Sequence, residues 1–200
     1  MILNNTSSKT EITGFSGIKI SLLKLYPFPE ELLNHFAARL VFKKLKKKDF
    51  LLRPDQISNS LAFINKGSLR FYTDTERNEL TINFFTENQW VADIESFLMQ
   101  QPSKNYIEAL ENSDLAIITL NDIHELMDLY PRFRMLNALM ADLTIPSTHL
   151  ATLSTKNPDE RYKDLLLKHP AWINRFPQMQ IASYLGMTPE TLSRVRGRVA

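Results

Sequence analysis

The chain has no cysteine among its 200 residues, which excludes disulfide bridges, thiolate zinc sites and cysteine-ligated iron–sulfur clusters. It also has no apolar run of 18 residues and no signal-peptide h-region. Such segments direct membrane insertion or secretion, so we predict a soluble, cytoplasmic protein with no membrane partner.

Motifs for catalysis and cofactor binding are missing as well. The five glycines form no Gly-rich phosphate loop, and no Ser/His/Asp signature occurs. The histidines are scattered without metal-ligand spacing, and no motif supports haem ligation by His124 or His149. We therefore predict a protein that is not an enzyme, with no metal and no assigned cofactor. The four histidines are His35, His124, His149 and His169.

Positive charge is concentrated at the C-terminal end. Residues 161–200 carry seven Lys and Arg against two Asp and Glu, a net charge of +5. The first 160 residues carry 17 against 20, a net charge of −3. A basic end on a slightly acidic body is typical of nucleic-acid binders.

Patterns in the first part of the chain predict a β-rich domain over residues 16–120. Residues 1–15 are polar and aperiodic, and we interpret them as a flexible arm. Residues 27–40 have the pattern of a helix, with Pro29 at its start. From Val41 the apolar period changes to two, which indicates strands.

Several strands follow at short intervals. The lysine run over 43–48 suits either nucleic acid or the solvated edge of a sheet, and the second is the commoner case. Residues 60–72 predict a hairpin that turns at 65–67, and Leu80–Phe85 pairs similarly after a polar turn. Asp114–Thr119 is the last clear strand. This spacing predicts an antiparallel β jelly-roll barrel.

Residues 121–156 predict two helices. Asn121 or Asp122 caps a short one that ends before Pro131, and a longer one runs from Pro131 to about Leu153, kinked at Pro146. The apolar stripe of the longer helix either packs on the barrel or forms a dimer seam. We favour the seam, because binding two DNA half-sites requires two copies of the module. The stripe comprises Phe133, Leu136, Leu139, Met140, Leu143 and Leu150.

The terminal domain, residues 157–200, has the pattern of a helix-turn-helix. Residues 178–185 contain no helix breaker, and Gly186 permits the left-handed conformation that ends a helix. Thr188 suits the N-cap and Pro189 the first position of a second helix, which in such motifs enters the DNA major groove. The apolar positions that join the two helices are Ala182, Leu192 and Val195.

The outer face of the second helix carries the predicted DNA contacts. Arg194 has the geometry to bind guanine, and Glu190 can accept a hydrogen bond from cytosine. The flanking side chains suit phosphates, which position the protein without specifying a sequence. An ordinary helical hairpin is the alternative, but too many positions agree with the DNA-binding motif. The predicted set is Thr188, Pro189, Glu190, Ser193, Arg194, Arg196 and Arg198.

The helix-turn-helix sequence resembles that of the Crp/Fnr family, which includes the cyclic-AMP receptor protein. The resemblance rests on residues 181–186 (Ile-Ala-Ser-Tyr-Leu-Gly) and 189–194 (Pro-Glu-Thr-Leu-Ser-Arg). Residues 65–70 are similar to the family's barrel hairpin, and 123–131 to the short helix before its dimerisation helix. The resemblance spans 20–198 and is closest to a short branch that ends just after the recognition helix. It implies an α+β fold: a cyclic-nucleotide-binding-like jelly roll, a long dimerisation helix and a terminal helix-turn-helix.

The sequence departs from the family at two places. The first base-contacting arginine of the family's recognition helix is replaced here by Pro189. Family members that bind cyclic AMP hold it with a Gly-Glu pair and a downstream Arg-Ser pair, which correspond to Ala92-Asp93 and Ser103-Lys104. Asp93 can replace the glutamate, but Ser103 replaces the arginine, and Lys104 offers no bidentate fork. The resemblance therefore implies an effector pocket that does not bind cyclic AMP.

These observations predict a homodimeric, sequence-specific transcriptional regulator that binds double-stranded DNA. The alternative is an interaction protein whose helical tail docks a protein partner. Arg194, Arg196 and Arg198 disfavour that alternative, since a protein-docking face would carry a hydrophobic anchor. Activation would also require a surface for RNA polymerase, and no motif identifies one.

Overall fold

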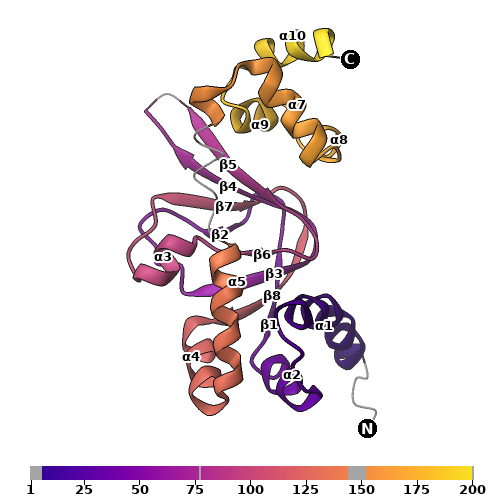
Figure 1. Cartoon of the computed structure of the whole chain (residues 1–200), viewed down its shortest axis with the longest axis vertical. Helices are drawn as coiled ribbons and strands as arrows, with labels where there is room; N and C mark the ends of the chain where they lie inside the picture. The colour runs from indigo at the N-terminus through magenta and orange to yellow at the C-terminus, as the bar shows by residue number, and fades with distance from the viewer. Residues whose placement is uncertain (1–5, 77, 144–151, 200) are drawn as a thin grey trace.

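The computed structural model of the chain describes residues 6–76, 78–143 and 152–199. The molecule is elongated, with two β-sheets in its middle. Most helices of the first 142 residues lie toward one end, and the terminal helices occupy the other (Figure 1). No helix within the described ranges is long and apolar enough to cross a membrane.

Two four-stranded antiparallel sheets form the centre, which confirms the predicted antiparallel β architecture. Apolar side chains such as Leu69, Phe71 and Ile107 fill one core of this centre. One sheet has the order β1 (Val41–Leu45), β8 (Ser113–Thr119), β3 (Ser60–Lys66) and β6 (Trp90–Val91). The other has the order β2 (Phe50–Leu52), β7 (Asn105–Ala109), β4 (Leu69–Asp74) and β5 (Glu79–Phe85).

The predicted lysine-rich edge and the predicted β4–β5 pairing are both confirmed. β1 lies at the edge of its sheet, and Lys43 and Lys44 are exposed. β4 and β5 pair antiparallel around the polar turn.

The predicted hairpin over 60–72 is wrong, because β3 and β4 belong to different sheets. The chain does turn there, at Gly67, whose φ of +97° favours glycine. A Cβ on Gly67 would lie 2.8 Å from the backbone Cα of Ser113. At this corner the chain crosses from one sheet to the other, and β8 passes so close that Gly67 has no room for a side chain.

Five helical segments cover one end of the sheets and share a core with them. Phe36 and Phe133 are both fully buried in this core. The predicted helix over 27–40 is confirmed in part as α2, and the short helix is confirmed as α4, although its N-cap is Thr119 rather than Asn121 or Asp122. The segments are α1 (Thr6–Leu25), α2 (Glu30–Ala37), α4 (Leu120–Leu129), the 3-10 helix η1 (Pro131–Met135) and α5 (Leu136–Asp142).

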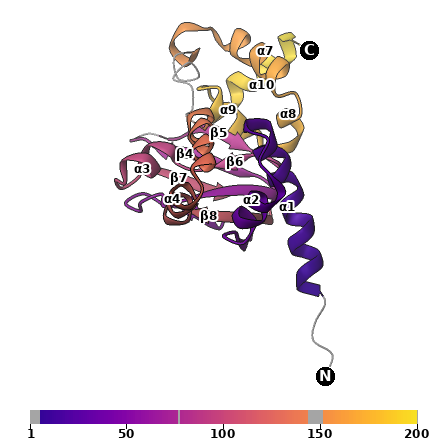
Figure 2. The ribbon, with the colours of Figure 1, turned by 60° about the horizontal axis from the view of Figure 1, so that its bottom comes forward.

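The prediction of a flexible arm over 1–15 is wrong from residue 6 onward, because α1 begins at Thr6; residues 1–5 lie outside the described part. Ile18 and Leu22 are fully buried and hold this helix on the body. A Cβ at Gly17 would lie 3.0 Å from the ring of Phe63, so glycine permits close packing of helix on sheet. In the sequence, Gly14 and Gly17 interrupt the helical pattern of this segment. Figure 2 shows α1 running along the body and extending beyond it.

The structure also differs from the predicted long helix and dimer seam. The chain forms η1 and α5, and residues 144–151, which include Pro146 and Leu150, lie outside the described residues. Four stripe residues are at most 7% exposed within the single chain, where Phe133 packs against Phe28 and Phe36, and α1 contacts α5. The described stripe therefore forms part of the chain's own core rather than an outward seam. These residues are Phe133, Leu136, Leu139 and Met140.

The terminal helices form a separate cluster at the opposite end. They are α7 (Pro158–Lys168), α8 (Trp172–Arg175), α9 (Gln178–Tyr184) and α10 (Pro189–Val199). A capping box starts α7: Asn157 accepts from the Glu160 amide, and the Glu160 carboxylate accepts from the Asn157 amide. Helix α7 therefore begins at Pro158, within the predicted terminal domain over 157–200.

Candidate nucleic-acid interface

The turn between α9 and α10 forms as its sequence predicts. Gly186 has φ of +61°, and a Cβ there would lie 2.9 Å from Nη1 of Arg161. That nitrogen donates to the carbonyl oxygen of Leu185 at 2.6 Å, at the end of α9. The hydroxyl of Thr188 accepts from the Thr191 amide at 3.2 Å and so caps α10.

Two buried aliphatic side chains fix α10 against α9. Leu192 and Val195 are at most 1% exposed, and Ala182 opposite them is fully buried. The small side chain of Ala182 lets the two helices approach closely. This packing fixes which face of α10 points outward.

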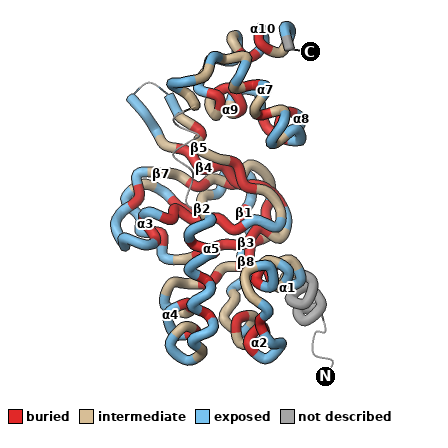
Figure 3. Tube along the Cα trace, viewed as in Figure 1, coloured by how far each residue is buried: buried red, intermediate tan, exposed pale blue. Residues whose placement is uncertain are grey.

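The outward face of α10 carries the predicted base-contacting side chains. Glu190, Ser193, Arg194 and Gly197 are all exposed, and Figure 3 shows α10 at the free end of the molecule. Hydrogen bonds from its own amide and from the Thr188 hydroxyl lower the pKa of Glu190, and Arg194 one turn away acts in the same direction. Glu190 is therefore ionised at neutral pH and available as an acceptor.

The two flanking arginines differ in their surroundings. Nη2 of Arg198 lies 2.6 Å from the Asp159 carboxylate, so this predicted phosphate ligand already has an anionic partner. Arg196 is half-buried. Pro189 is exposed as the first residue of α10.

An aromatic cluster joins the terminal helices to β5. The ring of Phe84 stacks on Phe176 with centroids 4.3 Å apart and meets Trp172 edge-on at 5.1 Å. Phe84 is only 1% exposed and belongs to the core of the terminal domain rather than to that of the sheets. This role of Phe84 was not predicted from the sequence, although Trp172 and Phe176 are one helical turn apart.

Polar contacts support the same junction. Nη1 of Arg175 lies 2.7 Å from Glu87, and Nη2 lies 2.7 Å from Glu111. The hydrogen bond from Arg175 lowers the pKa of Glu87 to about 2. The hydroxyl of Ser183 in α9 bonds to Glu79 and Thr81 of β5.

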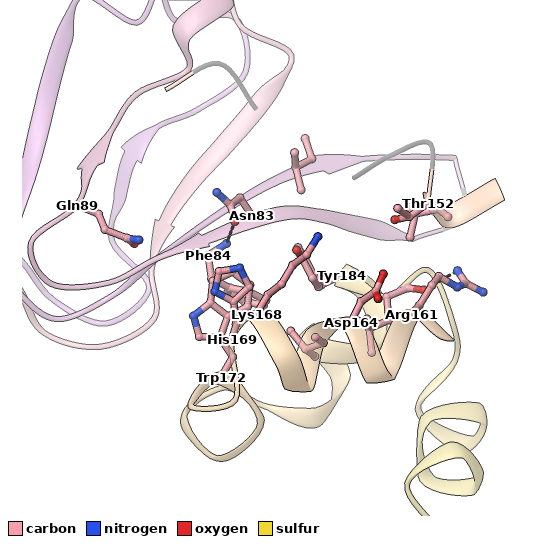
Figure 4. A pocket seen from close by; sticks show the side chains of 14 residues that line it. Asn83, Phe84, Gln89, Thr152, Arg161, Asp164, Lys168, His169, Trp172 and Tyr184 are labelled. Atoms are coloured by element: carbon pink, nitrogen blue, oxygen red, sulfur yellow. Dashed lines mark hydrogen bonds between the residues drawn. The ribbon is translucent and has the colours of Figure 1, made fainter. Parts of the chain in front are cut away.

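A cavity of about 280 Å³ lies beside this junction, between β5 and α7 (Figure 4). His169 stacks on Trp172 in its wall, with centroids 3.9 Å apart. Burial lowers the pKa of His169, and burial raises the pKa of Tyr184 to about 12. Both aromatic groups are therefore neutral at pH 7.

The predicted effector residues Asp93 and Ser103 contact each other. Oγ of Ser103 donates to Oδ2 of Asp93 at 2.6 Å, and Nδ2 of Asn105 donates to the same oxygen at 2.9 Å. Oδ1 of Asp93 accepts from the amide of Ser96 and caps α3 (Ile94–Met99). Asp93 is 4% exposed, so a buried carboxylate with internal partners occupies this position.

The other two predicted effector residues adjoin this pair in the chain but take no part in its hydrogen bonds. Lys104 is exposed. Ala92 lines a cavity of about 280 Å³ together with Leu52 and Ser58. The described residues include no cluster of three or more His, Asp or Glu side chains able to hold a metal.

Comparison with known proteins first defines the class of the central domain. Residues 42–130 match the cyclic nucleotide-binding domain family, a range that includes both sheets. The c-di-GMP responsive global regulator CLP of Xanthomonas campestris has a similar structure, with a TM-score of 0.67 at 14% identity. The match covers 86% of this chain and 91% of that one. The chain therefore combines a cyclic nucleotide-binding fold with terminal helices in the arrangement of a solved regulator.

Curated relatives extend the match along the chain. Electron transport regulator A of Shewanella oneidensis is 28% identical over 178 residues, which cover 78% of this chain and 67% of that protein. The fumarate and nitrate reduction regulatory protein of Escherichia coli is 25% identical over 174 residues, with the same coverage of 78% and 67%. The chain thus spans about two thirds of the length of these relatives. The central domain thus matches a cyclic nucleotide-binding domain, and these relatives are named as regulators.

Proposed function

We propose that this protein is a Crp/Fnr-type transcriptional regulator that binds double-stranded DNA through α10. The observation that carries the proposal is the outward face of α10, with Glu190, Ser193 and Arg194 exposed at the free end of the molecule. Arg194 presents two donors in a geometry that matches guanine, and ionised Glu190 matches the cytosine amino group. These two side chains would read the sequence.

The remaining predicted residues would hold the DNA backbone. Thr188, Ser193 and Arg196 lie on or beside the same face, where phosphates pass a recognition helix. Arg198 would exchange Asp159 for a phosphate, since one anionic oxygen can replace another at its guanidinium. That exchange requires no rearrangement of the helix backbone.

We also propose that the protein acts as a homodimer. Helix-turn-helix modules bind two half-sites about 34 Å apart, so one module per chain implies two chains per site. Because the described stripe residues are buried within the single chain, we place the interface on other surfaces. Light scattering of the purified protein tests this point, and a monomer that stays monomeric on its DNA site would contradict it.

Control by cyclic AMP is not included in the proposal. The buried carboxylate of Asp93 and the missing arginine at Ser103 leave no anion-binding fork where the family holds a phosphate. In this proposal, the cyclic nucleotide-binding domain keeps the fold of its family but lacks the arginine that would bind the phosphate of cyclic AMP.

The test is selection of binding sequences from a randomised DNA duplex pool at about 0.15 M salt, near physiological ionic strength. The proposal predicts enrichment of a two-fold symmetric site. Failure to enrich any sequence, with the protein folded, would contradict it and favour the interaction-protein alternative. Capture of a protein partner by the terminal helices would then be the next measurement.

A further inference from the structure

We propose that the cavity between β5 and α7 is a binding site for a small aromatic carboxylate, an anion that carries one ring or two fused rings. The cavity shares no described lining residue with the outward face of α10 or with the predicted effector residues. Figure 4 shows the side chains that line it, which come from the strand and the helices around it. The inference goes beyond the proposed function and does not depend on it, because it concerns a separate set of residues.

The floor of the cavity is apolar and largely aromatic. Phe84, Leu165 and Trp172 line it and are between 1% and 6% exposed. The ring of Tyr184 completes this wall, with its centroid 5.4 Å from that of Trp172 and 5.8 Å from that of Phe84. Aromatic pairs favour offset or edge-on contacts at centroid distances of about 4.5–7 Å. A flat ring that enters the cavity would therefore meet aromatic partners on its wall.

Hydrogen-bond donors stand at the rim of the cavity. Lys168 and Gln89 are exposed there, and Asn83 is half-buried. Oδ1 of Asn83 accepts from the Phe84 amide at 2.9 Å, and Oε1 of Gln89 accepts from the Thr86 amide at 2.7 Å. Each side-chain amide has thus used its oxygen, which leaves its NH2 group as a donor. Within the described ranges, neither NH2 group nor the Lys168 ammonium has a hydrogen-bond partner.

The charges in the wall favour an anionic ligand. Asp164 is the one acid among the described residues that line the cavity, and its carboxylate is paired with Lys156. Arg161 and Lys168 also line the cavity, and neither has a carboxylate partner in the described part of the chain. Nη1 of Arg161 donates to the carbonyl oxygen of Leu185, and its Nε is buried with no hydrogen-bond partner among the described residues. Buried charges in proteins are normally paired, so an anion in the cavity would complete this wall.

The volume of the cavity limits the ligand to a small molecule. The cavity measures about 280 Å³, whereas an apolar cavity of about 150 Å³ is enough to hold benzene. One ring or two fused rings with a carboxylate therefore fit the space. A bare inorganic anion would leave the aromatic floor uncovered, and an uncharged hydrocarbon would leave the donors unpaired. An aromatic carboxylate satisfies both parts of the site.

The first experiment titrates the full chain with 2-naphthoate by isothermal calorimetry at neutral pH. We expect saturable binding at one site per chain, with a dissociation constant of about 1 mM or lower for a ligand of this size. The two comparison ligands are 2-naphthamide, which has the same rings without the charge, and octanoate, which has the charge without the rings. Each should bind at least about tenfold more weakly, because each satisfies only one part of the site.

Two variants of the rim test where the carboxylate binds. Lys168→Met removes the ammonium and keeps an apolar stem. Asn83→Asp keeps the oxygen that accepts from the Phe84 amide but replaces the donor with a second anionic oxygen. We expect either change to weaken 2-naphthoate binding at least about tenfold. The matched control is Lys163→Met, which should bind like the wild type, because Lys163 is exposed on the same helix and does not line the cavity.

Thermal unfolding supplies a second readout and shows whether each variant is folded. A ligand that binds only the folded chain raises the unfolding temperature of that chain. With 2-naphthoate in excess, this temperature should rise for the wild type and for Lys163→Met, and the rise should be lost in Lys168→Met. A rise of the same size in Lys168→Met would contradict the assignment of the rim.

Each outcome of the titrations decides the question. Absence of saturable binding by the folded wild type would overturn the proposal, and so would binding of 2-naphthamide as tight as that of 2-naphthoate. Unchanged binding in folded Lys168→Met and Asn83→Asp would place the ligand elsewhere and overturn the proposal as well. If Asn83→Asp does not fold, Lys168→Met decides alone, since that side chain is exposed. None of these measurements uses DNA, so failure of the DNA selection would count against the proposed function only.

Discussion

The hydroxyl of Ser103 donates a 2.6 Å hydrogen bond to the carboxylate of Asp93, at the place where the family resemblance puts a phosphate-binding pair. Asn105 donates to the same oxygen, and the Ser96 amide donates to the other oxygen of that carboxylate. A buried carboxylate with internal partners is stable where it is and repels a phosphate.

This relationship predicts that cyclic AMP does not bind. A phosphate near Asp93 would meet a negative charge and no guanidinium, so isothermal titration should give no binding heat with cyclic AMP at millimolar concentration. Inorganic phosphate serves as the control for non-specific anion effects. Saturable binding of cyclic AMP would show that Lys104 or another cation replaces the missing arginine.

Arg194 and Arg196 of α10 should have different roles. Arg194→Ala should cost about 1–3 kcal/mol on the selected DNA site and relax preference at one base pair. Arg196→Ala should weaken specific and random duplexes alike and reduce the salt dependence of binding, as expected of a phosphate contact. Equal losses on both kinds of DNA for both variants would contradict this division.

Phe84 should hold the terminal helices on β5. Phe84→Ala removes a ring that is 1% exposed, and we expect a loss of about 3–5 kcal/mol in the free energy of unfolding. Urea unfolding followed by tryptophan fluorescence measures it, since Trp172 contacts the ring. Phe50→Ala, in which the deleted ring is only half-buried in β2, is the control and should cost less. A loss below about 1 kcal/mol for Phe84→Ala would show that the cluster does not join the two parts.

Docking of the terminal helices should weaken in acid. The pKa of Glu87 falls from 4.5 to about 2 because Arg175 bonds its carboxylate. A lowered pKa in the folded state gives stability that is present above pH 4.5 and is lost as the pH falls toward 2. Because the pair is partly exposed, solvent screening limits the effect to about 1 kcal/mol.

The measurement is the free energy of unfolding between pH 6 and pH 2, compared between the wild type and Glu87→Gln. The glutamine variant should be less stable near pH 6, and the difference should shrink as the pH falls through the window. A constant difference across the window would show that this carboxylate does not titrate as the ion pair requires.

The corner at Gly67 should tolerate no side chain. Gly67→Ala would place a Cβ 2.2 Å from Oγ of Ser113 and 2.8 Å from its Cα, with φ in the left-handed region. We expect a loss of at least about 2 kcal/mol or failure to fold, measured by thermal unfolding. Gly197→Ala is the matched control, since nothing lies within 4 Å of its added methyl, and it should stabilise α10 by up to about 1 kcal/mol. Equal effects of the two substitutions would contradict this account.

The sequence by itself determined the elements whose causes are local. Gly186, Thr188 and Pro189 specify a turn and a cap within four residues, so the helix-turn-helix could be predicted without knowing what surrounds it. The change of apolar period at Val41 likewise predicted strands, because alternation depends only on neighbouring residues.

Only the tertiary structure decided how these elements meet. The bonds from Ser183 to Glu79 and Thr81 join residues about a hundred positions apart, and no local pattern encodes such a partner. The sequence around Gly67 predicted a hairpin, but the chain crosses there from one sheet to the other. β8 passes beside this corner, and the sequence does not show which strand lies there.

The dimer seam shows the same limit. Periodicity identified an apolar stripe on residues 131–143 correctly, but it could not say whether a second chain or α1 covers it. Burial of apolar area stabilises either arrangement without regard to which surface supplies the contact. The sequence therefore determined that the stripe must be covered, and the three-dimensional fold decided that the chain's own helical core covers its described part.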